Sequence, residues 1–304
     1  MDTLTNLKTF MAVAKWGGFS DAARHLDVVP SVVAKRISQL EQELESRLFQ
    51  RSTRRVVITE AGVKLRSRAS GLLTEFDDLV RSVQRDDKKL EGHIRIMAPT
   101  TLTMMHLGKT LCAFMAQHER ITMEIALVDL SSNPEEQAFD LAISGRSASY
   151  EGVVDVPLCS TRLMLVAAPA CVERRLGSLN HPRELAEHPC LVFAPSGSRW
   201  NFQSTRGVLS IEVTPHLLAD DNLTLLQAAL AGMGVAVLPS YIAAQSLANG
   251  ELQELLPGFP LQDTWFRAHV PKRRMRVARI RALVDWIAQD LAVFSDRLQP
   301  TSRG

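Results

Sequence analysis

Three short stretches of helical periodicity within the first 48 residues constrain the fold of this chain more than any other feature. The first stretch ends at the pair Gly17-Gly18. A second, short helix is expected near residues 19–27, with Ser20 as its N-cap. A third helix begins around Pro30, because proline suits the first turn of a helix. The pattern predicts an all-α unit at the start of the chain.

The third helix is expected to have two chemically different faces. Its inner stripe is apolar and consists of Val33, Ile37, Leu40, Leu44 and Leu48. The opposite face is short, polar and basic, with Arg36 on its flank, and it consists of Ser31, Val32, Lys35, Ser38, Gln39 and Gln42. Such a helix can enter a DNA major groove, where basic side chains donate to guanine, glutamine pairs with adenine and valine touches a thymine methyl. For any single residue of this face, an ordinary solvated surface is the alternative.

The stretch after the third helix is rich in arginine and alternates towards β structure. Residues 49–59 therefore predict a two-stranded wing. A wing of this kind can lie on the phosphate backbone of DNA. The residues expected to contact phosphates there are Arg51, Ser52, Thr53, Arg54 and Arg55.

The distribution of charge favours double-stranded DNA as the partner of this N-terminal unit. The whole chain has a formal net charge of +2, yet residues 1–68 hold 12 Lys and Arg against 7 Asp and Glu. Neutralising phosphates with basic side chains releases counterions and so promotes binding. Charge alone is weak evidence, since most basic surfaces are simply solvated.

A heptad seam follows the expected wing. Its apolar positions, at alternating steps of four and three, are Leu65, Ala69, Leu72, Phe76, Leu79 and Val83. A long seam of this kind can pair with the same helix of a second copy. It can also pack on the body of its own chain, and the spacing leaves both alternatives open.

From Gly92 onward, strands alternate with helices, which predicts α/β structure with parallel sheets. The expected strands cover residues 93–97, 121–128, 140–144, 162–168, 190–193, 216–219 and 265–270, with a further apolar run at 231–239. The last of these strands is expected to return the chain to the first sheet. The pair Gly232 and Gly234 lacks the third glycine of a dinucleotide-binding loop and is interpreted as a turn.

Residues 10–62 resemble the DNA-binding region of LysR-type transcriptional regulators. The resemblance rests on Ala22, Ala23, Leu26, Ile37, Leu40, Glu41, Leu44, Leu48, Phe49, Arg51 and the run Thr59-Glu60-Ala61-Gly62. This chain has Val29, Pro30 and Ala34 where the family usually has serine and glutamine. Family roles in base reading therefore do not transfer to these three positions, and Lys35, Arg36, Arg51 and Arg54 are the strongest candidates.

The resemblance implies a winged helix-turn-helix at residues 1–60, a linker and dimerisation helix with a hinge at 61–91, and an effector-binding domain at 92–304. The effector domain resembles a periplasmic binding protein, through Asp140-Leu141-Ala142-Ile143 and the Gly232, Gly234 and Pro239 pattern. Its lobes are expected at about 92–161 with 267–304, and at about 162–266. The family also implies pairing of linker helices, a homodimer or homotetramer, an operator with an imperfect dyad and a contact with RNA polymerase.

A cleft between two α/β lobes is expected to bind a small effector, because helix N-termini there present free N–H groups to anions. An anionic effector is therefore predicted. The candidate residues at the ends of the expected strands are Thr100, Thr101, Thr103, Ser144, Arg146, Phe193, Ser196, Asn222 and Thr224. For the threonines and Asn222, ordinary helix capping is the alternative.

Several other functions find little support in the sequence. The chain lacks the common hydrolase, metalloprotease and nucleotide-binding motifs, and its histidines show no metal-ligand spacing, so no enzymatic activity, metal or cofactor is expected. No stretch is apolar enough to span a membrane, and a cytoplasmic location is expected. The four cysteines are scattered and are interpreted as reduced and mostly buried. Cysteine-based redox sensing and ligand-independent regulation remain the alternatives.

The basic run at residues 272–281 resembles a second nucleic-acid site only at first sight. Apolar residues from Val277 to Leu291 mark an amphipathic helix that packs on the first lobe. The arginines of the run are interpreted as its solvated face or as a subunit contact.

Overall fold

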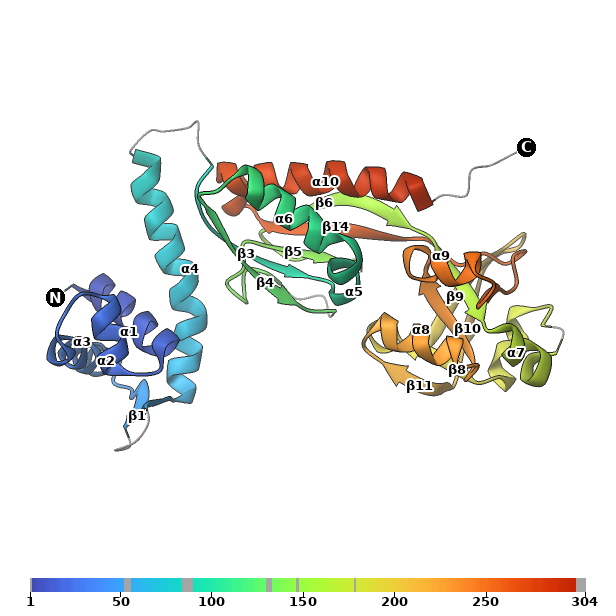
Figure 1. Ribbon diagram of the computed structural model, residues 1–304, viewed down its shortest axis with the longest axis horizontal. Coiled ribbons are helices and arrows are strands. Elements are labelled where there is room, and N and C mark those ends of the chain that lie inside the picture. The colour runs from blue at the N-terminus through green and yellow to red at the C-terminus, as the bar shows by residue number, and fades with distance from the viewer. Residues whose placement is uncertain are drawn as a thin grey trace. The chain divides into compact units, whose positions relative to one another are not determined.

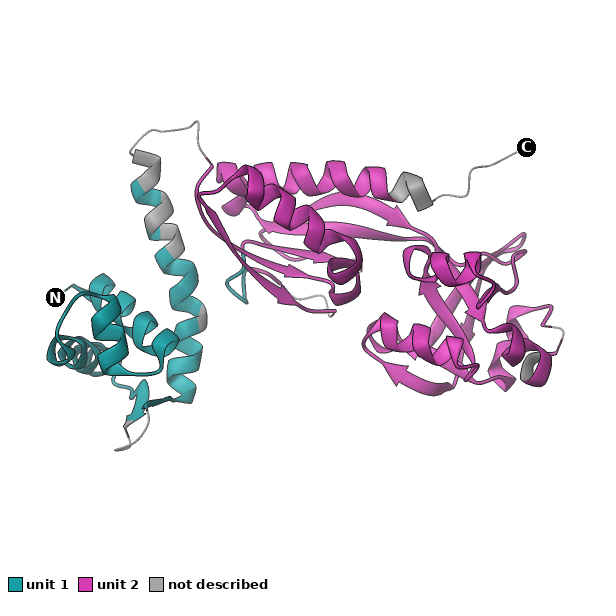
Figure 2. Cartoon of the chain, in the orientation of Figure 1, with its two compact units in different colours: residues 1–89, 135–139 teal, residues 90–134, 140–304 magenta. Residues whose placement is uncertain are grey.

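A computed structural model describes residues 2–51, 56–83, 90–129, 133–145, 148–177 and 179–298 (Figure 1). The chain forms two compact units, residues 1–89 with 135–139 and residues 90–134 with 140–304 (Figure 2). Each unit has an apolar core of its own.

The first unit consists of helices and a short antiparallel sheet. Its elements are α1 (Thr3–Trp16), α2 (Phe19–His25), α3 (Pro30–Glu43), β1 (Phe49–Arg51), β2 (Val56–Ile58) and α4 (Glu60–Val83). The predicted helices and wing strands are therefore present. Their core gathers one face of each helix, and Phe10, Val13, Val33 and Ile37 are completely buried in it.

Two expectations about these helices were wrong. Ser20 does not cap α2: the cap is Gly18, whose carbonyl accepts from the N–H of Ala22 at 3.0 Å. The apolar stripe of α3 does not continue to Leu44, which is 42 % exposed. The helix ends at Glu43, and at Glu45 the backbone takes a positive φ of 49° that turns the chain away. Leu48 then enters the core from the following segment.

A buried carboxylate joins α3 to the wing. Glu41 is 5 % exposed, and its Oε1 accepts from the backbone N–H groups of Leu48 at 2.8 Å and Phe49 at 3.2 Å. Its Oε2 accepts from Arg47 Nη1 at 3.2 Å. Burying a carboxylate is costly unless hydrogen bonds compensate for the lost water, and here three donors do so. Glu41 therefore fixes where β1 begins relative to α3.

A hydroxyl group and a close backbone contact fix the position of the start of α4. Thr59 Oγ1 accepts from the N–H of Gly62 at 3.0 Å and donates to the carbonyl of Arg47 at 2.6 Å. A Cβ on Gly62 would lie 2.4 Å from the carbonyl oxygen of Leu48 and 2.6 Å from Ile58 Cγ1. The run Thr59-Glu60-Ala61-Gly62 thus combines a helix cap with a contact that only glycine permits.

The apolar seam of α4 divides into two parts. Ala69 is 3 % exposed and belongs to the core of the first unit, and Leu65 packs against it. Leu72, Phe76 and Leu79 are 53 %, 40 % and 63 % exposed. The side chain of Val83 lies outside the described residues. Packing on the chain's own body therefore accounts for the first two seam positions and leaves an apolar face beyond them.

The second unit contains two five-stranded sheets and their flanking helices. The strands are β3 (Gly92–Ala98), β4 (Ile121–Leu127), β5 (Leu141–Ser144), β6 (Val153–Thr161), β7 (Leu163–Ala167), β8 (Cys190–Phe193), β9 (Arg199–Ser204), β10 (Gly207–Glu212), β11 (Pro215–Ala219), β12 (Val235–Pro239), β13 (Gln253–Glu254) and β14 (Thr264–Pro271). The longer helices are α6 (Gly108–Gln117), α8 (Asn222–Leu230), α9 (Ser240–Ala248) and α10 (Ala278–Leu298). Short helical segments are α5 (Thr100–Leu102), η1 (Thr103–Leu107), α7 (Pro169–Cys171), η2 (Val172–Leu176), η3 (Pro182–Glu187), η4 (Ala194–Ser196) and η5 (Arg274–Arg276).

Both sheets are mixed: the parallel pairing expected from the sequence joins β3 to β4 and β5, and β8 to β11 and β12, but each sheet also contains antiparallel pairs. The first has the order β4-β3-β5-β14-β6, and β14 runs antiparallel to both of its neighbours. The second has the order β11-β8-β12-β7-β13, with β7 antiparallel to β12 and β13. The sequence analysis also missed β6 and the hairpin of β9 and β10. The turn at Gly232 and Gly234 is present, and a Cβ on Gly234 would lie 2.2 Å from the carbonyl oxygen of Pro189.

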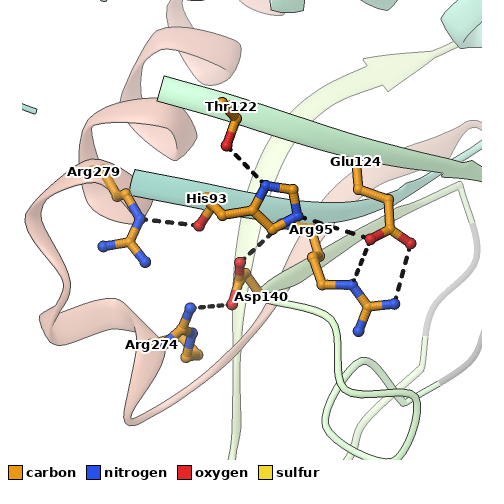
Figure 3. A network of polar contacts seen from close by, with 7 residues as sticks. All are labelled: His93, Arg95, Thr122, Glu124, Asp140, Arg274 and Arg279. Carbon is orange, nitrogen blue, oxygen red and sulfur yellow. Dashed lines mark hydrogen bonds and ion pairs between the residues drawn. The ribbon is translucent and has the colours of Figure 1, made fainter. Parts of the chain in front are cut away.

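A polar network lies beside the start of β3 (Figure 3). Arg274 is 4 % exposed and forms an ion pair with Asp140, whose other oxygen accepts from the N–H of Arg95 at 2.8 Å. Arg279 is 5 % exposed and its Nε donates to the carbonyl of His93 at 3.1 Å. The interpretation of these two arginines as solvated was therefore wrong. Each is buried because an acceptor distant in sequence compensates for its desolvation.

At the outer edge of the same network, Arg95 binds Glu124 through two hydrogen bonds of 2.9 and 3.1 Å. These bonds hold the pKa of Glu124 below its ordinary value. The Nδ1 of His93 lies 2.9 Å from Thr122 Oγ1. Strands β3 and β4 are thus joined by side chains as well as by their backbones (Figure 3).

Arg274→Ala is expected to lower the free energy of unfolding of the second unit by about 3–5 kcal/mol, because it leaves Asp140 buried without its charge partner. Arg276→Ala is the matched control: it removes the same charge from an exposed position of the same segment and should change stability by less than about 0.5 kcal/mol. Urea unfolding followed by tryptophan fluorescence measures the difference, since Trp200, Trp265 and Trp286 all belong to this unit. Equal stability of the two variants would contradict this account of the network.

Candidate functional site

Helix α3 presents the candidate DNA-reading surface of the first unit. Ser31 and Lys35 are exposed, whereas Val32, Arg36 and Gln39 are half-buried. The Arg36 side chain turns towards α1, where its Nη1 donates to Thr9 Oγ1 at 3.4 Å. The two basic candidates of this helix are therefore in different environments.

The start of α1 adds a negative charge near Arg36. Asp2 caps this helix by accepting from the Thr5 N–H at 3.0 Å and from the Thr5 hydroxyl. Hydrogen bonds from the hydroxyl and the N–H lower the pKa of Asp2, and the charge of Arg36 lowers it further. Arg36 thus interacts with α1, and Lys35 is the exposed basic side chain of α3.

The candidate phosphate contacts of the wing fall largely outside the structural description. Ser52, Thr53, Arg54 and Arg55 lie outside the described residues, as does the side chain of Arg51. The backbone of Arg51 pairs with that of Val56, so the two wing strands have a defined register.

A cavity of about 330 Å³ lies between the two sheets of the second unit. The chain passes from the first sheet to the second between β6 and β7, and it returns before β14. These two crossings lie side by side, because Thr161 at the end of β6 is paired with Thr264 at the start of β14. The cavity wall combines residues from both lobes, and these crossings form part of it.

Five of the candidate effector-binding residues line this cavity: Thr101, Ser144, Phe193, Ser196 and Asn222. Others have different environments. Thr100 donates its backbone N–H to Asp129 Oδ1 at 3.0 Å, and Thr224 donates both its N–H and its hydroxyl to Asp221. Thr103 is 9 % exposed and is not among the described lining residues. Arg146 lies outside the described residues.

Asp221 connects the lobes at the edge of the cavity. Its Oδ1 accepts from the Thr101 hydroxyl at 3.2 Å, and its Oδ2 accepts from the N–H of Thr224 at 2.8 Å. Burial alone would raise the pKa of Asp221, but hydrogen bonds from Thr224, Leu223 and Thr101 together hold it below its ordinary value. Asp221 is therefore ionised at neutral pH and is the N-cap of α8, a role that the sequence analysis had considered for Asn222.

The family models decide which family this chain belongs to. A model described as the lysR family of bacterial regulatory helix-turn-helix proteins matches residues 4–63. A second, the LysR substrate binding domain, matches residues 87–292. The chain belongs to the LysR family. Its N-terminal unit is therefore the helix-turn-helix of a LysR-type transcriptional regulator, and its C-terminal unit is the two-lobed effector-binding domain of such a regulator.

Similar proteins agree with this assignment to the LysR family. The transcriptional regulator PtxR of Pseudomonas aeruginosa is 29 % identical over 290 residues, which cover 95 % of this chain and 93 % of that protein. The regulator DmlR of Escherichia coli is 26 % identical, with 95 % and 94 % covered. Among solved structures, full-length AphB of Vibrio cholerae has a TM-score of 0.61 at 21 % identity, and it covers 94 % of this chain and 98 % of its own. CrgA of Neisseria meningitidis has a TM-score of 0.60 at 23 % identity, and the match covers 94 % of this chain and 98 % of CrgA.

The sequence analysis missed several residues that line the cavity of this LysR-family chain. They are Asp129, Thr161, Arg199, Trp200, Asn201, Tyr241, Gln262, Asp263 and Phe266. Some follow from the strands that it missed: Thr161 ends β6, and Arg199 begins β9. The candidate residues all lie near the ends of expected strands. The sequence pattern therefore did not point to lining residues on strands that were not expected.

The cysteines differ in accessibility. Cys159, Cys171 and Cys190 are buried, and Cys112 is exposed. Burial raises the pKa of Cys159 to about 11 and that of Cys190 to about 12. Both are therefore thiols at neutral pH, which makes them poor nucleophiles.

In the described part of the chain, no helix is long and apolar enough to cross a membrane.

Iodoacetamide is expected to modify Cys112 and to leave Cys159 and Cys190 intact in the folded protein. At pH 8 a thiol with a pKa of about 11 is ionised in about one molecule in a thousand, and burial restricts access further. Peptide mass spectrometry after a short pulse of reagent measures each site, with the urea-unfolded protein as the control for intrinsic reactivity. Rapid modification of Cys159 or Cys190 in the folded protein would support the redox alternative.

Proposed function

We propose that this LysR-family regulator reads its operator with the exposed face of α3 and pairs two copies through α4. We propose further that it responds to a small molecule bound between the lobes of its second unit. The exposed Lys35 on the polar face of α3 is the observation that carries the proposal. The functional boundaries that go with it are residues 1–60 for DNA binding, 61–91 for pairing and 92–304 for effector binding.

The different environments of Lys35 and Arg36 give these two residues of α3 different proposed roles. An exposed lysine on a helix in the major groove can donate to guanine, and a correct contact of this kind discriminates between bases by about 1–3 kcal/mol. Arg36 contacts Thr9 on α1, so we assign it to the orientation of α3 and to general attraction of phosphates. Ser31, Val32 and Gln39 remain candidates for base contacts, and residues 51–55 for phosphate contacts.

The exposed apolar part of α4 supports pairing of two copies. Leu72, Phe76 and Leu79 continue the seam and are exposed, although the neighbouring Leu73 still packs on the first unit and Lys8 Nζ lies 5.8 Å from the centre of the Phe76 ring. Exposed apolar side chains at heptad spacing gain free energy when a second helix covers them. Two helix-turn-helix units in one dimer imply an operator with an imperfect dyad. A homotetramer and a contact with RNA polymerase belong to the same proposal.

The cavity supports control by a small molecule. Residues of both lobes line the cavity, and the hydrogen bond from Thr101 to Asp221 joins one lobe to the other. A ligand that binds more tightly to one arrangement of the lobes would therefore increase the fraction of molecules in that arrangement. Membership of the LysR family supports the further proposal that this regulator is cytoplasmic and non-enzymatic. The high pKa values of Cys159 and Cys190 favour ligand control over redox control.

Lys35→Ala is expected to weaken operator binding by about tenfold and to relax the preference at one base-pair position in each half-site. Arg36→Ala should weaken binding without changing sequence preference. The operator is identified first by sequencing genomic fragments that the protein retains, and affinities are then measured by fluorescence anisotropy at fixed salt. Lys109→Ala, which removes the same charge from an exposed position of the second unit, is the control. An unchanged base preference in Lys35→Ala would overturn its assignment as a reading residue.

Leu72→Glu is expected to raise the dissociation constant of the dimer by about tenfold or more, because it would bury a carboxylate in an apolar helix pair. Val63→Glu makes the same change at an exposed position of α4 outside the seam and should have little effect. Sedimentation velocity across a dilution series measures both. If the two variants associate alike, the seam does not pair the subunits.

A further inference from the structure

The charges of the cavity differ from those that an anionic effector requires. Among its described lining residues, Asp129 and Asp263 are acidic and Arg199 is basic. The Nε of Arg199 lies 3.4 Å from Glu212 Oε2 on the neighbouring strand, and both side chains are more than 60 % exposed. The basic residue of the described lining therefore has a carboxylate partner outside the lining, and the described lining holds two acids against this one base.

The helix ends at the cavity also favour a ligand that is not an anion. The N–H of Thr100, at the start of α5, donates to Asp129, and the N–H of Thr224, in the first turn of α8, donates to Asp221. These are the donors through which helix starts bind anions. In this chain carboxylates already accept from the Thr100 and Thr224 N–H groups, so an anion would meet negative charge beside them.

A buried hydroxyl in the wall lacks a partner. Thr161 lines the cavity and is 6 % exposed, and its Oγ1 has no hydrogen-bond partner within the described ranges. Burying a hydroxyl without a partner is unfavourable, so such a group inside a cavity is a candidate for ligand binding. Thr161 pairs with Thr264, whose neighbour Asp263 also lines the cavity. A hydroxyl and a carboxylate thus lie close together in the chain crossings, and both can accept hydrogen bonds.

Aromatic rings form much of the remaining wall. Phe193, Trp200, Tyr241 and Phe266 line the cavity, and the rings of Tyr241 and Phe266 are 6.2 Å apart. Burial, aided by the negative charge of Asp129, raises the pKa of Tyr241, so this ring is a neutral phenol. The faces of aromatic rings attract cations as well as apolar groups. The wall therefore combines surfaces for an apolar body with acceptors for a positively charged group.

We propose that the effector is a small organic cation, an amine with an apolar body. Its ammonium group donates to Thr161 Oγ1 and is balanced by Asp263, which adjoins the paired residue Thr264, while Asp129, beyond the opposite edge strand of the first sheet, adds negative charge at longer range. Its apolar part lies against the aromatic wall. This inference rests on the proposed function, in which the cavity is the effector site. It replaces the anion expected from the sequence, an expectation that relied on Arg146 and on open helix ends.

Two series of compounds test the charge preference with the full-length protein. The first is 2-phenylethylamine, 3-phenylpropionate and 3-phenylpropanol, and the second is hexylamine, hexanoate and hexanol. Each series keeps its apolar body and changes the charged group. Isothermal titration calorimetry is expected to detect binding of at least one amine at about tenfold higher affinity than the matching acid. Tighter binding of the acids, or binding of neither amine, would overturn the proposal.

Variants of the wall test the assigned residues. Asp129→Asn keeps an oxygen that can accept from the Thr100 N–H but removes the charge, and Thr161→Val removes the hydroxyl at nearly constant volume. Each is expected to weaken amine binding by about tenfold and to leave binding of the matching alcohol less affected. Asp220→Asn, at an exposed position outside the described lining, is the matched control. An amine affinity unchanged in both wall variants would overturn the proposed binding mode.

The charge class of the ligand and the effector role of the cavity have separate tests. An acid that binds in the cavity and changes operator affinity would overturn the charge class and leave the cavity as the effector site. An amine that binds in the cavity but leaves operator affinity unchanged would support the charge class and count against the effector role. Operator affinity with and without each bound compound therefore separates the two.

Discussion

The pairing of β6 with β14 is the interaction on which the second unit depends. These strands belong to the first sheet, and the chain enters and leaves the second sheet at their adjoining ends, where Thr161 is paired with Thr264. The antiparallel pairing places both crossings together, so the lobes share one joint. Because this joint also supplies part of the cavity wall, a ligand that contacts Thr161 or Asp263 contacts the segment about which the lobes would turn.

Carboxylates that accept from several donors have a recurring role in both units; Glu41 and Asp140 are buried, and Asp221 is half-buried. Glu41 joins α3 to the wing, Asp140 joins β3 to η5, and Asp221 joins the start of α8 to Thr101. In each case one side chain accepts from donors that are distant in sequence or belong to different elements. Such a group stabilises one arrangement and penalises others, because any displacement leaves a desolvated charge with too few donors.

Local patterns in the sequence predicted the elements well and their environments less well. Helical periodicity and glycine placement located α1, α2 and α3, and the apolar run at 190–193 has the same bounds as β8. The direction of β14 is not encoded in a local pattern, because it depends on where the chain returns to the sheet. Arg274 was misjudged for the same reason: its partner Asp140 is more than a hundred residues away, and a basic run is by itself typical of a solvated face. Five of the candidate effector residues line the cavity, whereas Thr100, Thr103 and Thr224 are not among its described lining residues, and the lining residues on β6 and β9 were missed.

The close contact at Gly62 has a consequence for the whole of α4. With Thr59 and Ala69, it fixes the rotation of this helix about its own axis relative to α3, and the helix then continues to Val83. Successive residues of a helix are offset by about 100° around the axis. The direction in which the Leu72 and Phe76 side chains face is therefore set by the contacts at the first turn of α4. One residue added between Ala69 and Leu72 would turn that face by about a quarter of a revolution while leaving the DNA-reading helix itself unaltered.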